Sequence, residues 1–304
     1  MLRKKALRKM FITTLSMLII LTVYTIPTTS KPNVLRTNLE IEDITNLKTD
    51  KIYLLNKENY LVKTDVFIDS KKIEKRIEKI IDYLIINNNK IPSNLNGYIP
   101  KNTKLLDINI ESNSVLLNFS KEFKKSSDEE IMITGIVYSL LEIEDIKEVS
   151  FQVENKFYKD YNNLNKDIGI NKNILYTNRN NISKVVTYYL DESDNYYVPV
   201  TNYINDKREK IEIIVEDLTS NYIYEGNLKS FLNSKVKLMN YEIKDSIIEL
   251  AFNKVFMEDI NNKNITEEVV YTLCYSIFDN YDVDEIIFKV DNKEILKKSR
   301  KDIE

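Results

Sequence analysis

The chain has 304 residues, a net charge of −3 and no histidine. Its length predicts two domains, and its balanced charge gives no basic field that would favour nucleic acid as a partner. The absence of histidine excludes Ser-His-Asp and Cys-His catalysis and histidine metal sites. The four glycines lie too far apart for a phosphate-binding or dinucleotide-binding loop. A single cysteine excludes an intramolecular disulfide.

Residues 1–30 are predicted to be a signal peptide or a membrane anchor. Five basic residues occur within residues 1–9, and residues 10–30 contain no charged side chain. A run of this length can span a bilayer, which needs roughly 20 apolar residues, whereas Pro27 followed by small residues favours cleavage. Both alternatives would place residues 31–304 outside the cytoplasm; the structural alternative is a buried core helix. Because no cysteine lies near this segment, we expect no lipid anchor.

Residues 50–157 are predicted to form one small α+β domain. Residues 52–56 and 60–67 are rich in β-forming side chains on either side of a polar turn, which indicates a hairpin. Isoleucines at helical spacing follow over residues 73–84 and predict a helix.

Two further strands, a second helix and a closing strand complete the predicted domain. Apolar and polar residues alternate over residues 106–110 and again over 115–119, which indicates a hairpin with one buried face. The second helix follows Asp128, a favoured N-cap, and its apolar residues share one face. Residues 149–153 form the last strand. The order ββαββαβ predicts two helices on one face of a sheet, which is a two-layer sandwich.

The second half of the chain repeats the first. Three blocks match in the same order: residues 105–123 with 238–256, Tyr138-Ser139 and 151–156 with Tyr275-Ser276 and 288–293, and more loosely Tyr60-Leu61-Val62 with Tyr196-Tyr197-Val198. Ordered matches of this kind indicate a duplication. We therefore predict a second domain of the same plan at residues 184–295, after a linker at residues 158–183.

Several motifs in both copies resemble those of the GerMN domain family. In the first copy they are Ile99-Pro100-Lys101-Asn102-Thr103, Leu117-Asn118-Phe119-Ser120-Lys121-Glu122-Phe123 and Val137-Tyr138-Ser139-Leu140. The second copy retains Phe252-Asn253-Lys254-Val255-Phe256 and Cys274-Tyr275-Ser276-Ile277, but it has Phe231-Leu232 in place of Ile-Pro.

The resemblance implies a fold similar to the ring-building motif of secretion and sporulation complexes. It also implies a non-enzymatic role in sporulation and germination, in which the protein binds and supports an envelope or channel complex between mother cell and forespore. The expected partners are the proteins of that complex, and the membrane through the N-terminal helix. A second copy of the chain and peptidoglycan stay open as partners.

Two other functions stay open. A peptidoglycan-binding module would have aromatic residues clustered in a groove. An enzyme of cell-wall turnover would need only two carboxylates about 5–10 Å apart.

Individual residues predict no catalytic, cofactor or metal site. Ser120 has no histidine as a base and is replaced by Asn253 in the second copy, so we interpret it as a structural residue. Cys274 lies on an apolar helix face and is expected to be buried. The acidic residues between 279 and 285 lack the glycine and the final glutamate of a calcium loop. The paired glutamates Glu129-Glu130 and Glu267-Glu268 suit the first turn of a helix.

Tyrosine is favoured at protein interfaces. Six tyrosines are candidates for such a role: Tyr158, Tyr161, Tyr196, Tyr197, Tyr222 and Tyr224.

Overall fold

The computed structural model describes residues 49–172, 183–193, 195–205, 207–220, 227–263 and 266–303. The predicted signal or anchor at residues 1–30 lies outside them. Among the described residues, every helix is too short or too polar to cross a bilayer.

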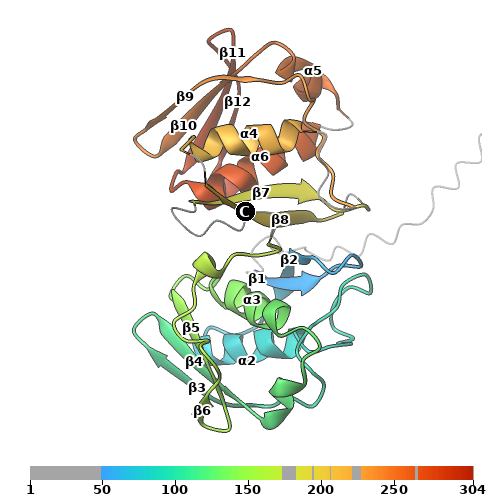
Figure 1. The fold of residues 1–304 in the computed structure, drawn as a ribbon, viewed down its shortest axis with the longest axis vertical. Coiled ribbons are helices and arrows are strands. Elements are labelled where there is room, and N and C mark those ends of the chain that lie inside the picture. The colour runs from blue at the N-terminus through green and yellow to red at the C-terminus, as the bar shows by residue number, and fades with distance from the viewer. Residues whose placement is uncertain are drawn as a thin grey trace, which may run out of the picture. The chain divides into compact units, whose positions relative to one another are not determined.

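The first copy follows the predicted order of elements (Figure 1). Its elements are β1 (Thr49–Leu55), β2 (Leu61–Phe67), α2 (Ile73–Tyr83), β3 (Leu105–Glu111), β4 (Ser114–Phe119), the 3-10 helix η2 (Lys121–Lys125), α3 (Glu129–Leu140), β5 (Glu148–Val153) and a short β6 (Lys156–Phe157). A second 3-10 helix, η3 (Lys166–Ile168), follows in the predicted linker. As predicted, α3 begins after Asp128, whose side chain accepts a hydrogen bond from the Ile131 N–H at 3.0 Å.

The second copy repeats this order, which confirms the duplication. Its elements are β7 (Ser183–Leu190), β8 (Tyr197–Ile204), α4 (Lys210–Thr219), β9 (Leu238–Lys244), β10 (Ile247–Phe252), α5 (Phe256–Asn261), α6 (Thr266–Asn280), β11 (Glu285–Val290), β12 (Lys293–Ser299) and α7 (Arg300–Ile303).

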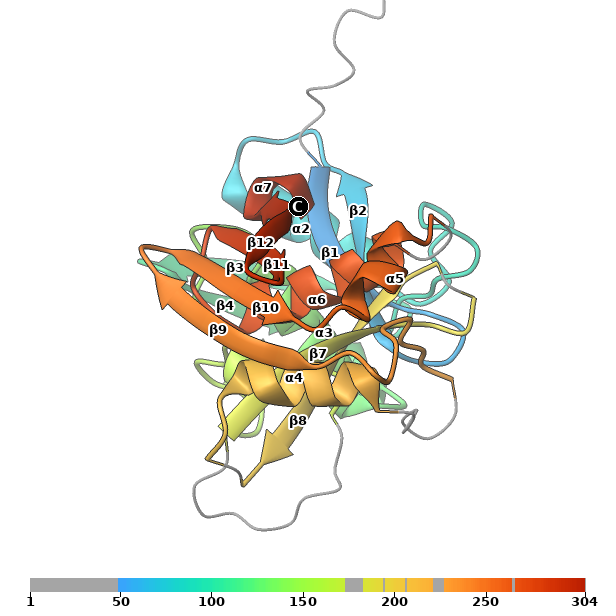
Figure 2. The ribbon, with the colours of Figure 1, turned by 90° about the horizontal axis from the view of Figure 1, so that it is seen from above.

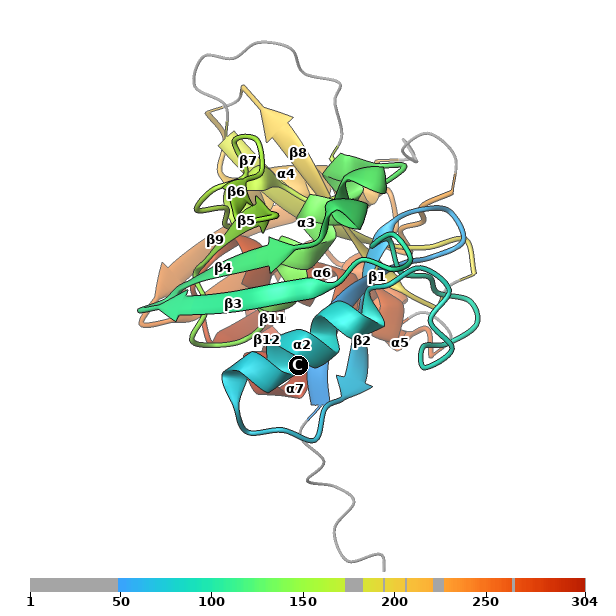
Figure 3. The ribbon, with the colours of Figure 1, turned by 90° about the horizontal axis from the view of Figure 1, so that it is seen from below.

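Each copy has one mixed four-stranded sheet and one separate hairpin. The sheet orders are β3-β4-β5-β6 and β12-β11-β10-β9, in which β4 pairs with β5 and β10 with β11 in parallel. Figure 2 shows the sheet of the second copy, and Figure 3 shows β3 and β4 of the first copy with α2 beside them. In both sheets the first strand, β3 or β9, lies at the edge. The strand that follows it in the chain, β4 or β10, lies inside the sheet.

The prediction of a two-layer sandwich is wrong. The hairpin β1–β2 forms a two-stranded sheet of its own, and α3 contacts both β1 and β5 from different sides (Figure 1). The physical reason lies in α3 itself, because every residue from Met132 to Leu140 is buried. A helix that is buried all round needs cover on more than one side, and the hairpin supplies it.

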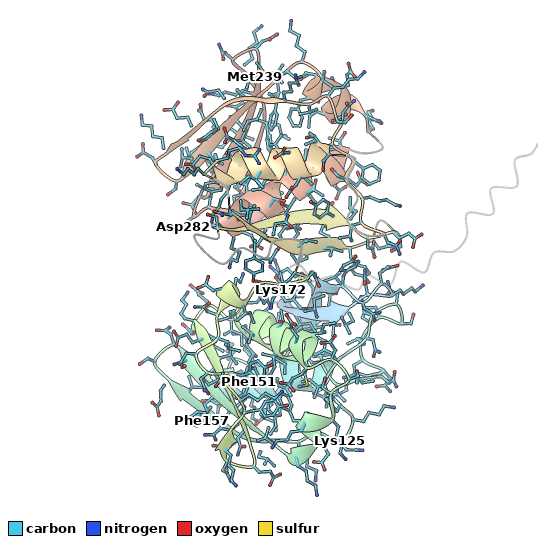
Figure 4. All side chains as sticks on the ribbon, in the orientation of Figure 1. Lys125, Phe151, Phe157, Lys172, Met239 and Asp282 are labelled. Atoms are coloured by element: carbon cyan, nitrogen blue, oxygen red, sulfur yellow. The ribbon has the colours of Figure 1, made fainter. Side chains whose placement is uncertain are left out.

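An aromatic cluster fills the core of each copy in the same way. Phe119 and Phe123 stack with ring centroids 4.3 Å apart, and Phe151 lies 6.1 Å from Phe123. The matching rings of the second copy are Phe252, Phe256 and Phe288, with a distance of 4.4 Å between the first two. Phe151 lies inside the first copy between its sheet and helices (Figure 4). The repeated Phe-x-x-x-Phe spacing therefore marks a core cluster and not a surface.

The hairpin of each copy is bound to its long helix by a buried serine. The Tyr53 N–H donates to Ser139 Oγ at 2.9 Å, and the Ser139 hydroxyl donates to the Gly135 carbonyl at 2.7 Å. In the second copy Ser276 links the Tyr188 N–H to helix α6 at 2.8 Å. Buried backbone donors of an edge strand must find a partner, which explains the Tyr-Ser pair in both copies.

Candidate functional site

The two copies contact each other through equivalent residues of their hairpins. Asn56 Nδ2 donates to Asp191 Oδ2 at 3.4 Å, and both side chains are buried. Each of them also holds its own loop: Asn56 Oδ1 accepts from the Tyr60 N–H at 2.9 Å and Asp191 Oδ1 from the Tyr196 N–H at 3.2 Å. The equivalent strands β2 and β8 contact each other as well. Use of the same elements on both sides is typical of an isologous interface.

Asn171 joins the two hairpins directly. Its Oδ1 accepts from the Leu61 N–H at 2.9 Å, and its Nδ2 donates to the carbonyls of Leu61 and Pro199, both at 2.8 Å. The preceding Ile170 is fully buried and exchanges two hydrogen bonds with Thr201. The described part of the predicted linker is therefore packed against both copies.

Replacing Asn171 with glycine should lower the free energy of unfolding by roughly 1–2 kcal/mol, because it leaves three backbone groups without their partner. Glycine tolerates the left-handed backbone at this position, where φ is 44°, so the loss reports the hydrogen bonds. Guanidinium denaturation followed by circular dichroism measures it. Asn102→Gly is the control, because Asn102 is exposed and has a φ of 65°. Equal losses in the two variants would contradict the bridging role of Asn171.

A tyrosine and a carboxylate meet beside the interface in each copy. Tyr53 Oη donates to Glu142 Oε1 at 3.4 Å, and Tyr188 Oη donates to Asp279 Oδ2 at 2.6 Å. Burial raises the pKa of both tyrosines well above the usual value, and nearby carboxylates raise it further. Both phenols are therefore protonated donors at neutral pH and cannot act as bases.

Two lysines compensate the charge of Glu142. Its carboxylate lies 2.7 Å from Lys63 Nζ and 3.4 Å from Lys166 Nζ. Burial opposes ionisation of Glu142, but the two lysines outweigh it and hold its pKa below the ordinary value. The cluster is internally satisfied, so it suits a structural connection between hairpin, helix and the segment around η3 better than catalysis.

Sequence reasoning missed Glu142 and considered Asp279 only as a calcium ligand, although a signal for their shared role is present. They occupy the same column when Tyr138-Ser139 is aligned with Tyr275-Ser276. A carboxylate retained three residues after the buried serine in both copies indicates a shared hydrogen bond. Asn171 has no such signal, because it lies between the copies and has no counterpart.

The other residues that the sequence singled out have structural positions. Ser120 is buried, and its Oγ accepts from the Lys104 N–H at 3.1 Å. Cys274 is fully buried, and burial raises the pKa of its thiol to about 12. The paired glutamates lie in the first turns of α3 and α6, as predicted. Within the described ranges, no group of three acidic or cysteine residues is placed to hold a metal ion.

The six candidate interface tyrosines have different positions. Tyr158 is buried against Phe123 inside the first copy and donates to Glu129 at 2.8 Å. Tyr161 packs against Tyr158. Tyr196 and Tyr197 lie where the two copies meet and line a cavity there. Tyr222 and Tyr224 lie outside the described residues.

Both copies of the domain are similar to known proteins. A sequence profile described as Germane, sporulation and spore germination, matches residues 51–159 and 186–296. The structure of the tandem GerMN domains of the sporulation protein GerM from Bacillus subtilis aligns with a TM-score of 0.71 and 21% identity, over 83% of this chain and 96% of that chain. The first GerMN domain of GerM from Bacillus subtilis aligns with a TM-score of 0.36 and 18% identity, over 40% of this chain and 98% of that chain. A search of curated protein sequences finds no significant match.

The profile match covers both copies and more than half of the chain, and the tandem GerMN structure shows the same fold. The predicted resemblance is thereby confirmed: the chain belongs to the Germane, or GerMN, family of sporulation and spore germination domains and contains two copies of that domain.

Proposed function

We propose that this sporulation and germination protein acts outside the cytoplasm, by binding and not by catalysis, and supports an envelope or channel complex between mother cell and forespore. Residues 1–30 would direct export and either anchor the chain in the membrane or be cleaved, with no lipid attached. The domains at residues 50–157 and 184–295 would then face the protein partners. Family membership supports the proposed role in sporulation and germination.

The observation that carries the proposal is a pair of exposed apolar side chains at equivalent places on the edge strands. Leu106 on β3 is 48% exposed and Met239 on β9 is 65% exposed. Met239 lies at the outer end of its copy (Figure 4). Edge strands present unpaired backbone groups to which a partner strand can add, and exposed apolar side chains favour such contacts. A protein partner would therefore bind along β3, β9 or both.

Site-specific photo-crosslinking in the sporulating host tests this proposal. A photoreactive amino acid at position 106 or 239 should give adducts with an envelope protein during sporulation only. The control position is Lys125, which is exposed on η2 and belongs to neither edge strand. Equal adducts at all three positions would refute the edge as the binding face. A deletion strain that sporulates and germinates normally would refute the process itself.

A further inference from the structure

A cluster of tyrosine rings occupies one side of the interface between the copies. Tyr197 and Tyr275 lie 5.1 Å apart by ring centroids, Tyr188 lies 5.4 Å from Tyr275, and Tyr271 lies 6.0 Å from Tyr197. Three of these rings, on Tyr197, Tyr271 and Tyr275, are only half-buried. A cavity of about 130 Å³ opens beside Tyr188, Tyr197 and Tyr275, and we call it the tyrosine groove. Its lining includes Tyr188, Tyr196, Tyr197, Tyr275, Lys51, Lys63 and Asp65.

The first copy has no tyrosine at two of the equivalent places. Leu61 stands in the place of Tyr197 and Thr134 in the place of Tyr271, and both are buried. The duplicated fold is therefore stable without these two rings. The ring of Tyr197 lines the groove, although the first copy folds with a leucine in its place, which points to a ligand.

A second cavity, which we call the amide pocket, is adjacent to the tyrosine groove. Its volume is about 590 Å³, within the range of roughly 300–1,000 Å³ that is usual for ligand sites. Seven asparagines contribute to its lining: Asn56, Asn59, Asn87, Asn88, Asn89, Asn94 and Asn96. Asn94 of this pocket donates to the Tyr196 hydroxyl of the groove at 2.9 Å. This hydrogen bond joins the lining of the pocket to the lining of the groove, so the two cavities are neighbours.

The chemistry of the walls selects the class of ligand. An amide side chain offers two donors and one acceptor oxygen without net charge, which complements the hydroxyl and acetamido groups of a sugar. A tyrosine ring offers a flat apolar face with a polar tip, which complements the C–H face of a pyranose. Lys63 is already paired with Glu142 at 2.7 Å, and Lys51 lies opposite Asp65 in the pairing of β1 with β2. A nearly neutral wall of this kind disfavours a polyanion.

We infer that the tyrosine groove and the amide pocket together bind a neutral glycan chain built of N-acetylated amino sugars. A sugar ring stacks on Tyr197, and the acetamido groups hydrogen-bond with the asparagines. This binding site is separate from the edge strands proposed above for protein partners. An experiment can therefore refute either proposal without refuting the other.

Calorimetric titration of the full chain in detergent with chitotetraose, a tetramer of N-acetylglucosamine, tests the inference. The protein should bind chitotetraose, and should bind maltotetraose, which lacks acetamido groups, at least tenfold more weakly. Tyr197→Ala and Asn89→Ala should each weaken chitotetraose binding at least tenfold. Asn89 is exposed and is not in a left-handed conformation, so its variant keeps the test valid if Tyr197→Ala fails to fold.

Tyr241→Ala is the matched control, because Tyr241 is a half-buried tyrosine on β9 outside both cavities. It should leave the affinity within twofold. No detectable binding of chitotetraose would overturn the inference. Equal binding of both tetramers, or affinity unchanged in Asn89→Ala and in a folded Tyr197→Ala, would overturn it as well.

Discussion

Replacing Phe123 with alanine should lower the free energy of unfolding by about 3–5 kcal/mol, the usual cost of deleting a buried aromatic ring. Phe123 has no exposed surface and stacks on Phe119 with an interplanar angle of 5°. Tyr158 meets it edge-on at 5.6 Å and Phe151 lies 6.1 Å away, so the deletion removes three ring contacts together with the buried area. Urea or guanidinium denaturation measures the loss, with circular dichroism to verify the native fold.

The second copy supplies a matched variant and the surface supplies a control. Phe256→Ala removes the equivalent ring, which has no exposed surface and lies 4.4 Å from Phe252, and it should cost a similar amount. Phe157→Ala should change stability by less than about 1 kcal/mol, because that side chain is 63% exposed. A loss below about 1 kcal/mol in Phe123→Ala would show that the ring is not a core residue.

These aromatic residues explain why part of the fold is visible in the sequence. Alternating apolar residues in β4 and β10, followed by a phenylalanine four positions after the last strand residue, recur in both copies because the same core is built twice. Burial on one face leaves a period of two in a strand, so the hairpins and their order could be predicted. The Asp128 cap could be predicted for a similarly local reason.

The layering and the contact between the copies could not be predicted in this way. In β1, Ile52, Tyr53 and Leu54 are all buried, and an unbroken apolar run does not reveal which element covers each face. The residues that join the copies, Asn56, Asn171 and Asp191, are polar types that also favour turns. Their role depends on which surfaces meet, and that is decided by the packing of whole domains.

The same limit applies to a group of three polar residues in the second copy, which we call the polar trio: Thr187, Asn202 and Asp217. Asp217 Oδ2 accepts hydrogen bonds from Thr187 Oγ1 at 3.0 Å and from Asn202 Nδ2 at 2.8 Å. Thr187 and Asn202 are buried between the hairpin and α4. The equivalent places in the first copy hold only apolar, buried side chains: Ile52, Val66 and Ile80. The second copy thus has a half-buried carboxylate where the first copy has a buried isoleucine, and desolvation of its charge costs stability.

Asp217→Asn should stabilise the protein by about 2 kcal/mol at pH 8 and by almost nothing at pH 4. Burial raises the pKa of Asp217 to about 6, whereas an unfolded aspartate titrates near about 3.9. The folded state thus binds the proton more tightly, so the stability contributed by this group is full below about pH 4 and is lost as the pH rises through about 6. Asparagine retains an acceptor oxygen for Thr187 and Asn202 but has no charge to desolvate.

Denaturation of both proteins at several pH values between 4 and 8 measures the difference, in which the other titrating groups cancel. Glu216→Gln is the control, because Glu216 is the adjacent carboxylate but is 59% exposed and paired with Arg208; its difference should stay below about 1 kcal/mol at every pH. An Asp217→Asn difference that does not change with pH would show that this carboxyl group ionises as easily in the folded protein as in the unfolded chain. The polar trio would then be a solvated site at the hairpin and not a charge held inside the core.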